Sequence, residues 1–82
     1  MIRHIDITND ELRKKIRRRE ILMGGNSRLK IYGSLLCNSG KRMNKNNRVF
    51  FASVEEAVQL GFRPCGRCMR DAYQTWKNGL IQ

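Results

Sequence analysis

The feature that most restricts the fold of this 82-residue chain is a pair of cysteines, Cys65 and Cys68, separated by two residues. The pair lies in the run FRPCGRC (residues 62–68), which places arginines before and between the thiols. Two thiolates at this spacing on a tight turn can hold one zinc ion, but a structural zinc site needs four ligands. The chain offers one further cysteine, Cys37. The role of Cys37 and the identity of a fourth ligand therefore decide what kind of site forms.

A metal site fits these cysteines better than a disulfide framework. A domain this short buries a modest core and often depends on a metal or another cross-link. The N-terminus lacks the apolar segment of an export signal, and no apolar run is long enough to span a bilayer. We therefore expect a cytoplasmic protein with reduced thiols. The alternative is a metal-free domain in which Cys65 and Cys68 are buried as small apolar residues.

Positive charge is unevenly distributed along the chain. Seventeen Lys and Arg against seven Asp and Glu give a formal net charge of +10, and residues 21–54 contain no acidic residue. Such an asymmetric field favours polyanions, nucleic acid above all. A basic but merely solvated surface is the alternative. An anionic membrane is disfavoured because the basic residues lie mostly in turns and not along one amphipathic helix.

Local signals predict a small α+β domain. Capping boxes that open at Thr8 and Ser53 predict an N-terminal and a middle helix, and a third helix is expected from residue 68 to about residue 78. Segments 29–32 and 48–51 have the composition of strands. Residues 24–26, GGN, are expected to end the first segment. We expect an N-terminal helical extension (1–28) and a zinc-stapled unit with a short antiparallel sheet (29–82), together forming one compact unit.

Three stretches carry a resemblance to a known family: NRVFF (47–51), the helix that opens at Ser53, and GFRPCGRC (61–68). Over roughly residues 30–71 the chain resembles the metal-binding domain of the Ada family, a module of a bacterial DNA repair and adaptive-response protein. The resemblance implies one zinc ion, held in the family by a Cys-x-x-x-Cys and a Cys-x-x-Cys pair. It also implies that the first cysteine of the first pair irreversibly accepts a methyl group from a methylated DNA phosphate, because zinc keeps its sulfur as a thiolate.

The chain departs from this family pattern at the first pair, where it has one cysteine and not two. If Cys37 matches the second cysteine, the methyl-accepting position falls on Gly33, which has no nucleophile. If Cys37 matches the first, its partner position falls on Lys41 and a zinc ligand is missing. The distances along the chain to residues 47–49 and to Cys65 favour the first alignment. We therefore expect Cys37 to be a ligand, with no catalytic residue; the alternative is an enzyme in which Cys37 accepts the methyl group.

Three thiolates leave one zinc coordination position to fill. His4, the only histidine, and Asp71, three residues after Cys68, are the candidate fourth ligands from the chain. Water is the third option and would give an open site of the catalytic type. The ordinary alternatives are an exposed or capped histidine at position 4 and a surface salt bridge at position 71.

The resemblance also implies contacts with DNA phosphates. Arg63 matches the arginine of the family's FRPC motif and is the first candidate; further candidates are Arg67, Lys41, Arg42 and Arg48. No element resembles a recognition helix, so we expect backbone docking without strong base readout. The leading hypothesis is a monomeric Ada-like zinc module, with no small-molecule cofactor, that docks on the DNA backbone in the bacterial cytoplasm, at the nucleoid. The alternatives are a suicide methyltransferase using Cys37 and a basic adaptor for an acidic protein partner.

Overall fold

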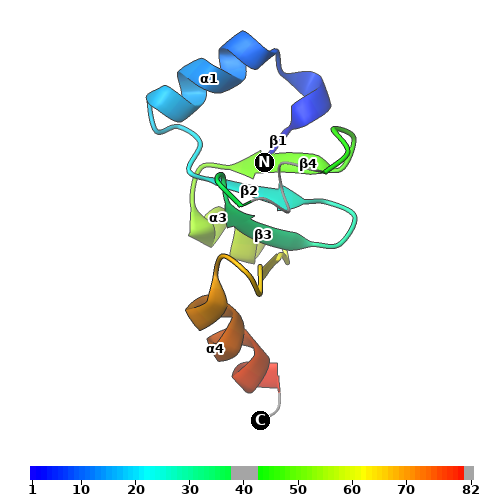
Figure 1. Cartoon of the computed structure of the whole chain (residues 1–82), viewed down its shortest axis with the longest axis vertical. Coiled ribbons are helices and arrows are strands. Elements are labelled where there is room, and N and C mark those ends of the chain that lie inside the picture. Colours follow the sequence, from blue (N-terminus) through cyan, green and yellow to red (C-terminus); the bar gives the residue numbers. More distant parts are fainter. Residues whose placement is uncertain (38–42, 81–82) are drawn as a thin grey trace.

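The predicted α+β class is confirmed by the computed structural model, which describes residues 1–37 and 43–80 (Figure 1). Within these residues five strands form one sheet in the order β1-β4-β2-β3-β5. The strands are β1 (Ile2–Arg3), β2 (Met23–Asn26), β3 (Ile31–Ser34), β4 (Arg48–Phe51) and β5 (Arg63–Pro64). The helices are η1 (His4–Asp6, a 3₁₀ turn), α1 (Asn9–Arg17), α3 (Val54–Gln59) and α4 (Arg70–Leu80).

We expected an antiparallel sheet, but the sheet is mixed. Strand β2 pairs antiparallel with β3 and β4, and β1 pairs antiparallel with β4. The exception is β5, which lies parallel to β3 with Ile31 opposite Arg63 and Tyr32 opposite Pro64. This parallel pair arises because the middle helix returns the chain to the sheet in the direction of β3. It is the pairing that brings the cysteine run beside β3.

The prediction that residues 24–26 end the N-terminal segment is wrong. Helix α1 already ends at Arg17, and the glycine-rich run forms part of β2 at the centre of the sheet. Packing requires a glycine here: a Cβ on Gly25 would lie 2.7 Å from the Ile31 carbonyl oxygen and 2.9 Å from the Phe51 ring. Residues 1–28 therefore supply a strand that pairs on both sides with the rest of the chain.

Both predicted helix starts are confirmed. The Thr8 hydroxyl accepts a hydrogen bond from the Glu11 N–H at 3.1 Å, and the Glu11 carboxylate accepts one from the Thr8 N–H at 3.4 Å. At α3 the Ser53 hydroxyl accepts a hydrogen bond from the Glu56 N–H at 3.1 Å. These contacts satisfy amide groups that have no partner within the first helical turn.

Helix α3 ends at Gln59, and the expected glycine, Gly61, follows the capping residue Leu60 with a φ of +87°, a conformation that glycine adopts without strain. The Gly61 N–H donates to the Val58 carbonyl, and the Phe62 N–H donates to the Ala57 carbonyl, both at 3.0 Å. This pair of hydrogen bonds is a Schellman motif. It turns the chain directly into β5 and the cysteine pair.

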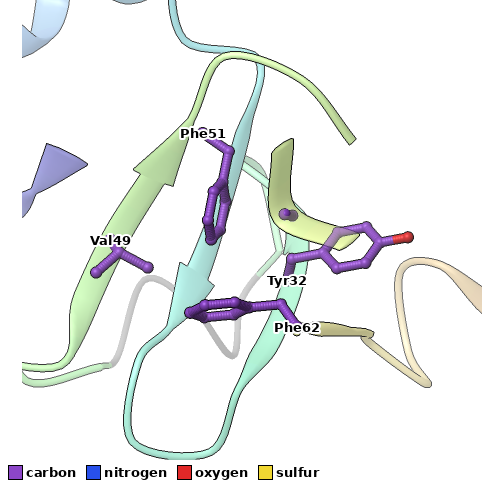
Figure 2. Close-up of a cluster of buried hydrophobic side chains, with 5 residues drawn as sticks. Tyr32, Val49, Phe51 and Phe62 are labelled. Carbon is purple, nitrogen blue, oxygen red and sulfur yellow. The ribbon is translucent and has the colours of Figure 1, made fainter. Parts of the chain in front are cut away.

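The main hydrophobic core lies between the sheet and α3 (Figure 2). Phe51 and Phe62 meet edge to face, with ring centroids 4.8 Å apart and planes inclined at 72°. The cluster is completed by Tyr32, Val49 and Ala57. Its five members are 0–4% exposed, so it is dry and close-packed.

Helix α4 begins at Arg70, two residues after the predicted start, and projects from the sheet at the end opposite α1 (Figure 1). The molecule is accordingly elongated, with principal extents of 43 × 24 × 20 Å. In the part of the chain that the structure describes, no helix is long and apolar enough to cross a membrane.

Candidate metal centre

The structure brings the three cysteines predicted as metal ligands into one cluster. The sulfur atoms of Cys37, Cys65 and Cys68 all lie within 4.8 Å of one another. They come from two segments, the turn after β3 and the turn after β5, so only the folded chain assembles them. We call these three side chains the thiol cluster.

The parallel β3–β5 pair positions the second of these turns. The Cys65 N–H donates to the Tyr32 carbonyl at 2.8 Å, which extends the ladder and fixes Cys65 at the end of β5. The Met69 N–H then donates to the Cys65 carbonyl at 3.0 Å, so the chain turns back on itself over residues 65–69. This turn returns Cys68 to β3, where its sulfur accepts a hydrogen bond from the Ser34 N–H at 3.3 Å.

Ser34 also organises the first turn. Its carbonyl accepts a hydrogen bond from the Cys37 N–H at 3.1 Å, and its hydroxyl accepts one from the Leu36 N–H at the same distance. These contacts reverse the chain directly after β3. Cys37, half-buried, is therefore held near the edge of the sheet where Cys65 and Cys68 lie.

Gly33 faces Cys65 and Cys68 of the thiol cluster. A Cβ built on Gly33 would lie 2.7 Å from the Cys68 sulfur and 3.1 Å from the Cys65 Cβ. A side chain at this position would therefore point toward the Cys68 sulfur and Cys65. The missing Cβ leaves the space that the Cys68 sulfur uses.

The chemistry of this donor set fits a single zinc ion. In the metal-free protein the pKa of the Cys68 thiol is raised to about 11, chiefly by burial and further by the neighbouring Cys37 and Cys65 thiols, while the Ser34 N–H opposes the shift. Three adjacent sulfurs cannot all ionise without a cation between them. A zinc ion supplies that cation and takes the sulfurs as thiolates.

The structure does not bring either proposed fourth ligand to the thiol cluster. Among the described residues, no His, Asp or Glu joins the three cysteines. His4 instead packs edge-on against Phe50, with ring centroids 5.4 Å apart, and burial together with Arg48 and Lys45 lowers its pKa. Asp71 is exposed in the first turn of α4. Residues 38–42, which lie outside the described part, are NSGKR and contain none of these residue types.

The candidate phosphate-binding residues separate into three kinds. The half-buried Arg63 places its guanidinium carbon 5.4 Å from the Tyr73 ring centre and 5.6 Å from that of Trp76, and it donates to the Pro64 carbonyl at 3.1 Å. Arg67 is exposed between the paired cysteines, and Arg48 is half-buried over the Phe50 ring at 5.2 Å. Lys41 and Arg42 lie outside the described residues.

Beside the thiol cluster lies a half-open cavity of about 320 Å³ that sequence reasoning did not anticipate. Gly33, Cys37 and Cys65 form one wall, and Arg48 and Arg67 also line it. Its residues come from β2, β3, β4 and both cysteine turns, so no local sequence signal marks it. The side chains of Leu29, Ile31, Leu35 and Met43 make much of the remaining wall apolar.

Comparison with known proteins supports the metal site. The sequence model of the family described as "Metal binding domain of Ada" matches residues 12–71, which reaches further toward the N-terminus than the resemblance over residues 30–71. The regulatory protein ada of Salmonella typhimurium (strain LT2) is 49% identical over 35 residues. That alignment covers 43% of this chain and 10% of the Salmonella protein, so the chain corresponds to a small part of this relative. No solved structure gives a significant match.

Proposed function

Because the chain belongs to the family of Ada metal-binding domains, we propose that it is a zinc-stabilised module that docks on the DNA phosphate backbone without accepting a methyl group. The family and the Salmonella relative give it a DNA repair context. The observation that carries the more specific proposal is the geometry at Gly33. In the alignment that makes Cys37 a ligand, the methyl-accepting cysteine of the family corresponds to Gly33, which faces the thiol cluster but carries no sulfur.

Cys37, Cys65 and Cys68 would hold the zinc ion. When bound, the ion supplies positive charge that keeps the three sulfurs as thiolates and links the turn after β3 to the turn after β5. The Ser34 N–H, 3.3 Å from the Cys68 sulfur, is a donor that stabilises the anionic form of that ligand. The chain's own groups thus orient the cluster.

Arg67 is the residue that we propose as the first phosphate contact. It is exposed, and it lies between the paired cysteines. Arg48 lines the same cavity and adds a second guanidinium. Arg63 has a different proposed role, because its guanidinium lies over two rings of α4 and one of its N–H groups is hydrogen-bonded to the Pro64 carbonyl. It positions α4 beside the thiol cluster.

DNA binding of this kind depends on charge more than on base sequence. The net charge of +10 attracts the backbone, and each phosphate neutralised lowers the slope of log K against log salt by about 0.9. We expect affinity for unmodified duplex DNA that falls steeply with salt and changes little with sequence. Fluorescence anisotropy over a salt series measures both. Arg67→Gln should make the slope shallower, whereas Arg13→Gln on the exposed face of α1 is the charge-matched control.

Intact-mass measurement after incubation with DNA that carries methyl phosphotriesters tests the absence of methyl transfer. The zinc-loaded protein should gain no methyl group. Gly33→Cys, which directs a thiol toward the thiol cluster, should gain one, and Gly33→Ala controls for the added Cβ. A methyl group found on Cys37 of the unaltered protein would overturn the binding-only function and support a suicide methyltransferase. Failure to bind any DNA at low salt would favour the adaptor with an acidic protein partner.

A further inference from the structure

The proposed DNA docking uses two arginines, Arg48 and Arg67, that line the cavity beside the thiol cluster, but it gives no role to the largely apolar interior of that cavity. We propose that this cavity, together with the fourth coordination position of the zinc ion, binds a small anionic thiol: a low-molecular-weight molecule that carries one thiol and one carboxylate. This inference rests on zinc binding by Cys37, Cys65 and Cys68. It assigns to the chain a ligand site in addition to the DNA surface.

The chain leaves one position of a tetrahedral zinc ion to an outside ligand. Cys37, Cys65 and Cys68 supply three donors, and no fourth His, Asp or Glu joins them among the described residues. Gly33, whose missing side chain would point into the cluster, supplies none. Three protein ligands with one open position is the arrangement of zinc sites that bind exogenous molecules.

A cavity lies beside the thiol cluster that would hold the ion. Gly33, Cys37 and Cys65 belong to its wall, so a ligand in the cavity reaches the thiol cluster directly. A volume of about 320 Å³ lies at the lower end of the range for small-molecule pockets, roughly 300–1,000 Å³, and excludes a large ligand. The apolar side chains of Leu35 and Met43 line part of the wall and suit a short hydrocarbon stem.

The charges of a loaded zinc site and of the cavity wall differ in sign. Zinc with three thiolates carries a net charge of −1, which by itself repels an anionic fourth ligand. Arg48 and Arg67 also line the cavity and place two positive charges there. A guanidinium forms paired, charge-assisted hydrogen bonds with a carboxylate. The cavity therefore offers a soft metal position for sulfur and a separate cationic position for a carboxylate.

Binding involves no redox change. The thiol of the ligand would give its proton to solvent, and its sulfur would replace the water at the fourth zinc position, which leaves to solvent, so that four sulfurs hold the ion. The carboxylate remains ionised and pairs with the guanidinium groups. A neutral thiol lacks the contact between carboxylate and guanidinium, and a simple carboxylate lacks the contact between sulfur and zinc. The two contacts can therefore be measured separately.

The experiment uses the full chain loaded with Co²⁺, whose absorption reports the number of bound sulfurs. Addition of mercaptoacetate should increase the sulfur-to-cobalt charge-transfer absorption, and native mass spectrometry should show protein, metal and ligand together. 2-Mercaptoethanol should bind about tenfold more weakly, the loss of one charge-assisted contact. Acetate should leave the charge-transfer absorption unchanged.

Two variants locate the site. Arg67→Gln, at an exposed position, should reduce the affinity for mercaptoacetate toward that for 2-mercaptoethanol, since Arg48 alone then faces the carboxylate, while cobalt binding stays unchanged. Gly33→Cys should abolish the response, because its thiol occupies the fourth position; circular dichroism checks its fold. If Gly33→Cys does not fold, the Arg67→Gln comparison alone carries the test.

The outcomes separate this inference from the proposed function. Cobalt and DNA binding with no spectral response to mercaptoacetate would overturn the ligand site and leave the DNA module standing. Equal affinity for the charged and neutral thiols would overturn the anionic pocket, and removal of cobalt from the protein by the thiol would overturn the ternary site. Failure to bind any metal would overturn the proposed function itself.

Discussion

The hydrophobic core beside α3 and the segment that carries two of the three thiols are stabilised in different ways. The core between the sheet and α3 consists of apolar side chains that are 0–4% exposed, with Phe51 and Phe62 at its centre. In contrast, no side chain from residue 65 to residue 79 is buried, although these residues carry two of the three thiols and most of α4. We refer to residues 65–80 as the thiol end.

This contrast indicates which interaction stabilises each region. Burial of large aromatic side chains contributes several kcal/mol at a single position, and it stabilises the core whether or not a metal is present. Among the described residues, Met69 is the one apolar side chain of the thiol end that packs against that core. The thiol end is otherwise held by the hydrogen bonds of Cys65 and Cys68 to β3 and by the contact of Arg63 with the α4 rings. A metal cross-link replaces hydrophobic burial in such a segment. The core is thus expected to fold by burial and the thiol end by zinc.

Removal of the metal should have the largest effect and should act mainly on the thiol end. Structural zinc contributes apparent binding free energies of about 10–16 kcal/mol in small zinc domains. We expect chelation, or Cys65→Ser, to lower the hydrogen-exchange protection of the α4 amides far more than that of β2 and β4. Equal loss of protection in both regions would show that the core also depends on the metal and would break the contrast.

Phe51→Ala should destabilise the whole molecule by about 3–5 kcal/mol, because it removes a fully buried ring and leaves a cavity in the core. Urea unfolding of the zinc-loaded protein measures the change. The control is Val58→Ala on α3, where the side chain is 55% exposed, and a change within about 0.5 kcal/mol is expected. An equally small effect of Phe51→Ala would mean that zinc, not burial, stabilises the core.

Arg63→Gln should loosen α4 by about 1–2 kcal/mol without affecting the core. It removes the guanidinium from Tyr73 and Trp76 and ends the hydrogen bond to the Pro64 carbonyl. Hydrogen exchange of α4 in the zinc-loaded protein measures the change. Arg67→Gln is the matched control, since Arg67 is exposed, and it should leave α4 protection unchanged. Equal effects of both substitutions would indicate that positive charge, and not the contact with the two rings, stabilises α4.

The smallest effect should be a loss of stability of the metal-free protein at high pH. The folded state raises the pKa of Cys68 from its ordinary value of 9.0 to about 11, so folding favours the protonated thiol. The contribution of the protonated Cys68 thiol to the free energy of unfolding is fully present below pH 9 and is lost as the pH rises through 11. Urea unfolding across this range, with Cys68→Ser as control, measures it. With zinc bound the sulfur is a thiolate at every pH of the series, and the dependence should disappear.

Local signals in the sequence predicted local structure well. The capping residues Thr8 and Ser53, and Gly61 at the end of α3, act through hydrogen bonds within a few residues, so their roles could be recognised without the fold. The grouping of Cys37 with Cys65 and Cys68 followed from the family resemblance and is confirmed by the thiol cluster.

Long-range contacts account for the features of the fold that the sequence did not predict. The glycines of β2 look like a segment end, but neighbouring strands require them for close packing, as the contacts at Gly25 show. The stacking of Arg63 on Tyr73 and Trp76 depends on the direction of α4, which no spacing reveals. His4 and Asp71 were considered only for their chemistry, and the fold places neither in the thiol cluster.

The parallel pairing of β3 with β5 has a consequence for the order of folding. Hairpin β2–β3 closes a loop of a few residues, whereas β5 reaches β3 only after the chain has passed through β4 and α3. Contacts between residues far apart in sequence carry the larger loop-closure entropy and form later. Since the Cys65 N–H extends this last pairing, the thiols meet when the rest of the sheet already exists. Zinc binding should then follow the slowest phase of refolding and lower the rate at which the completed fold opens again.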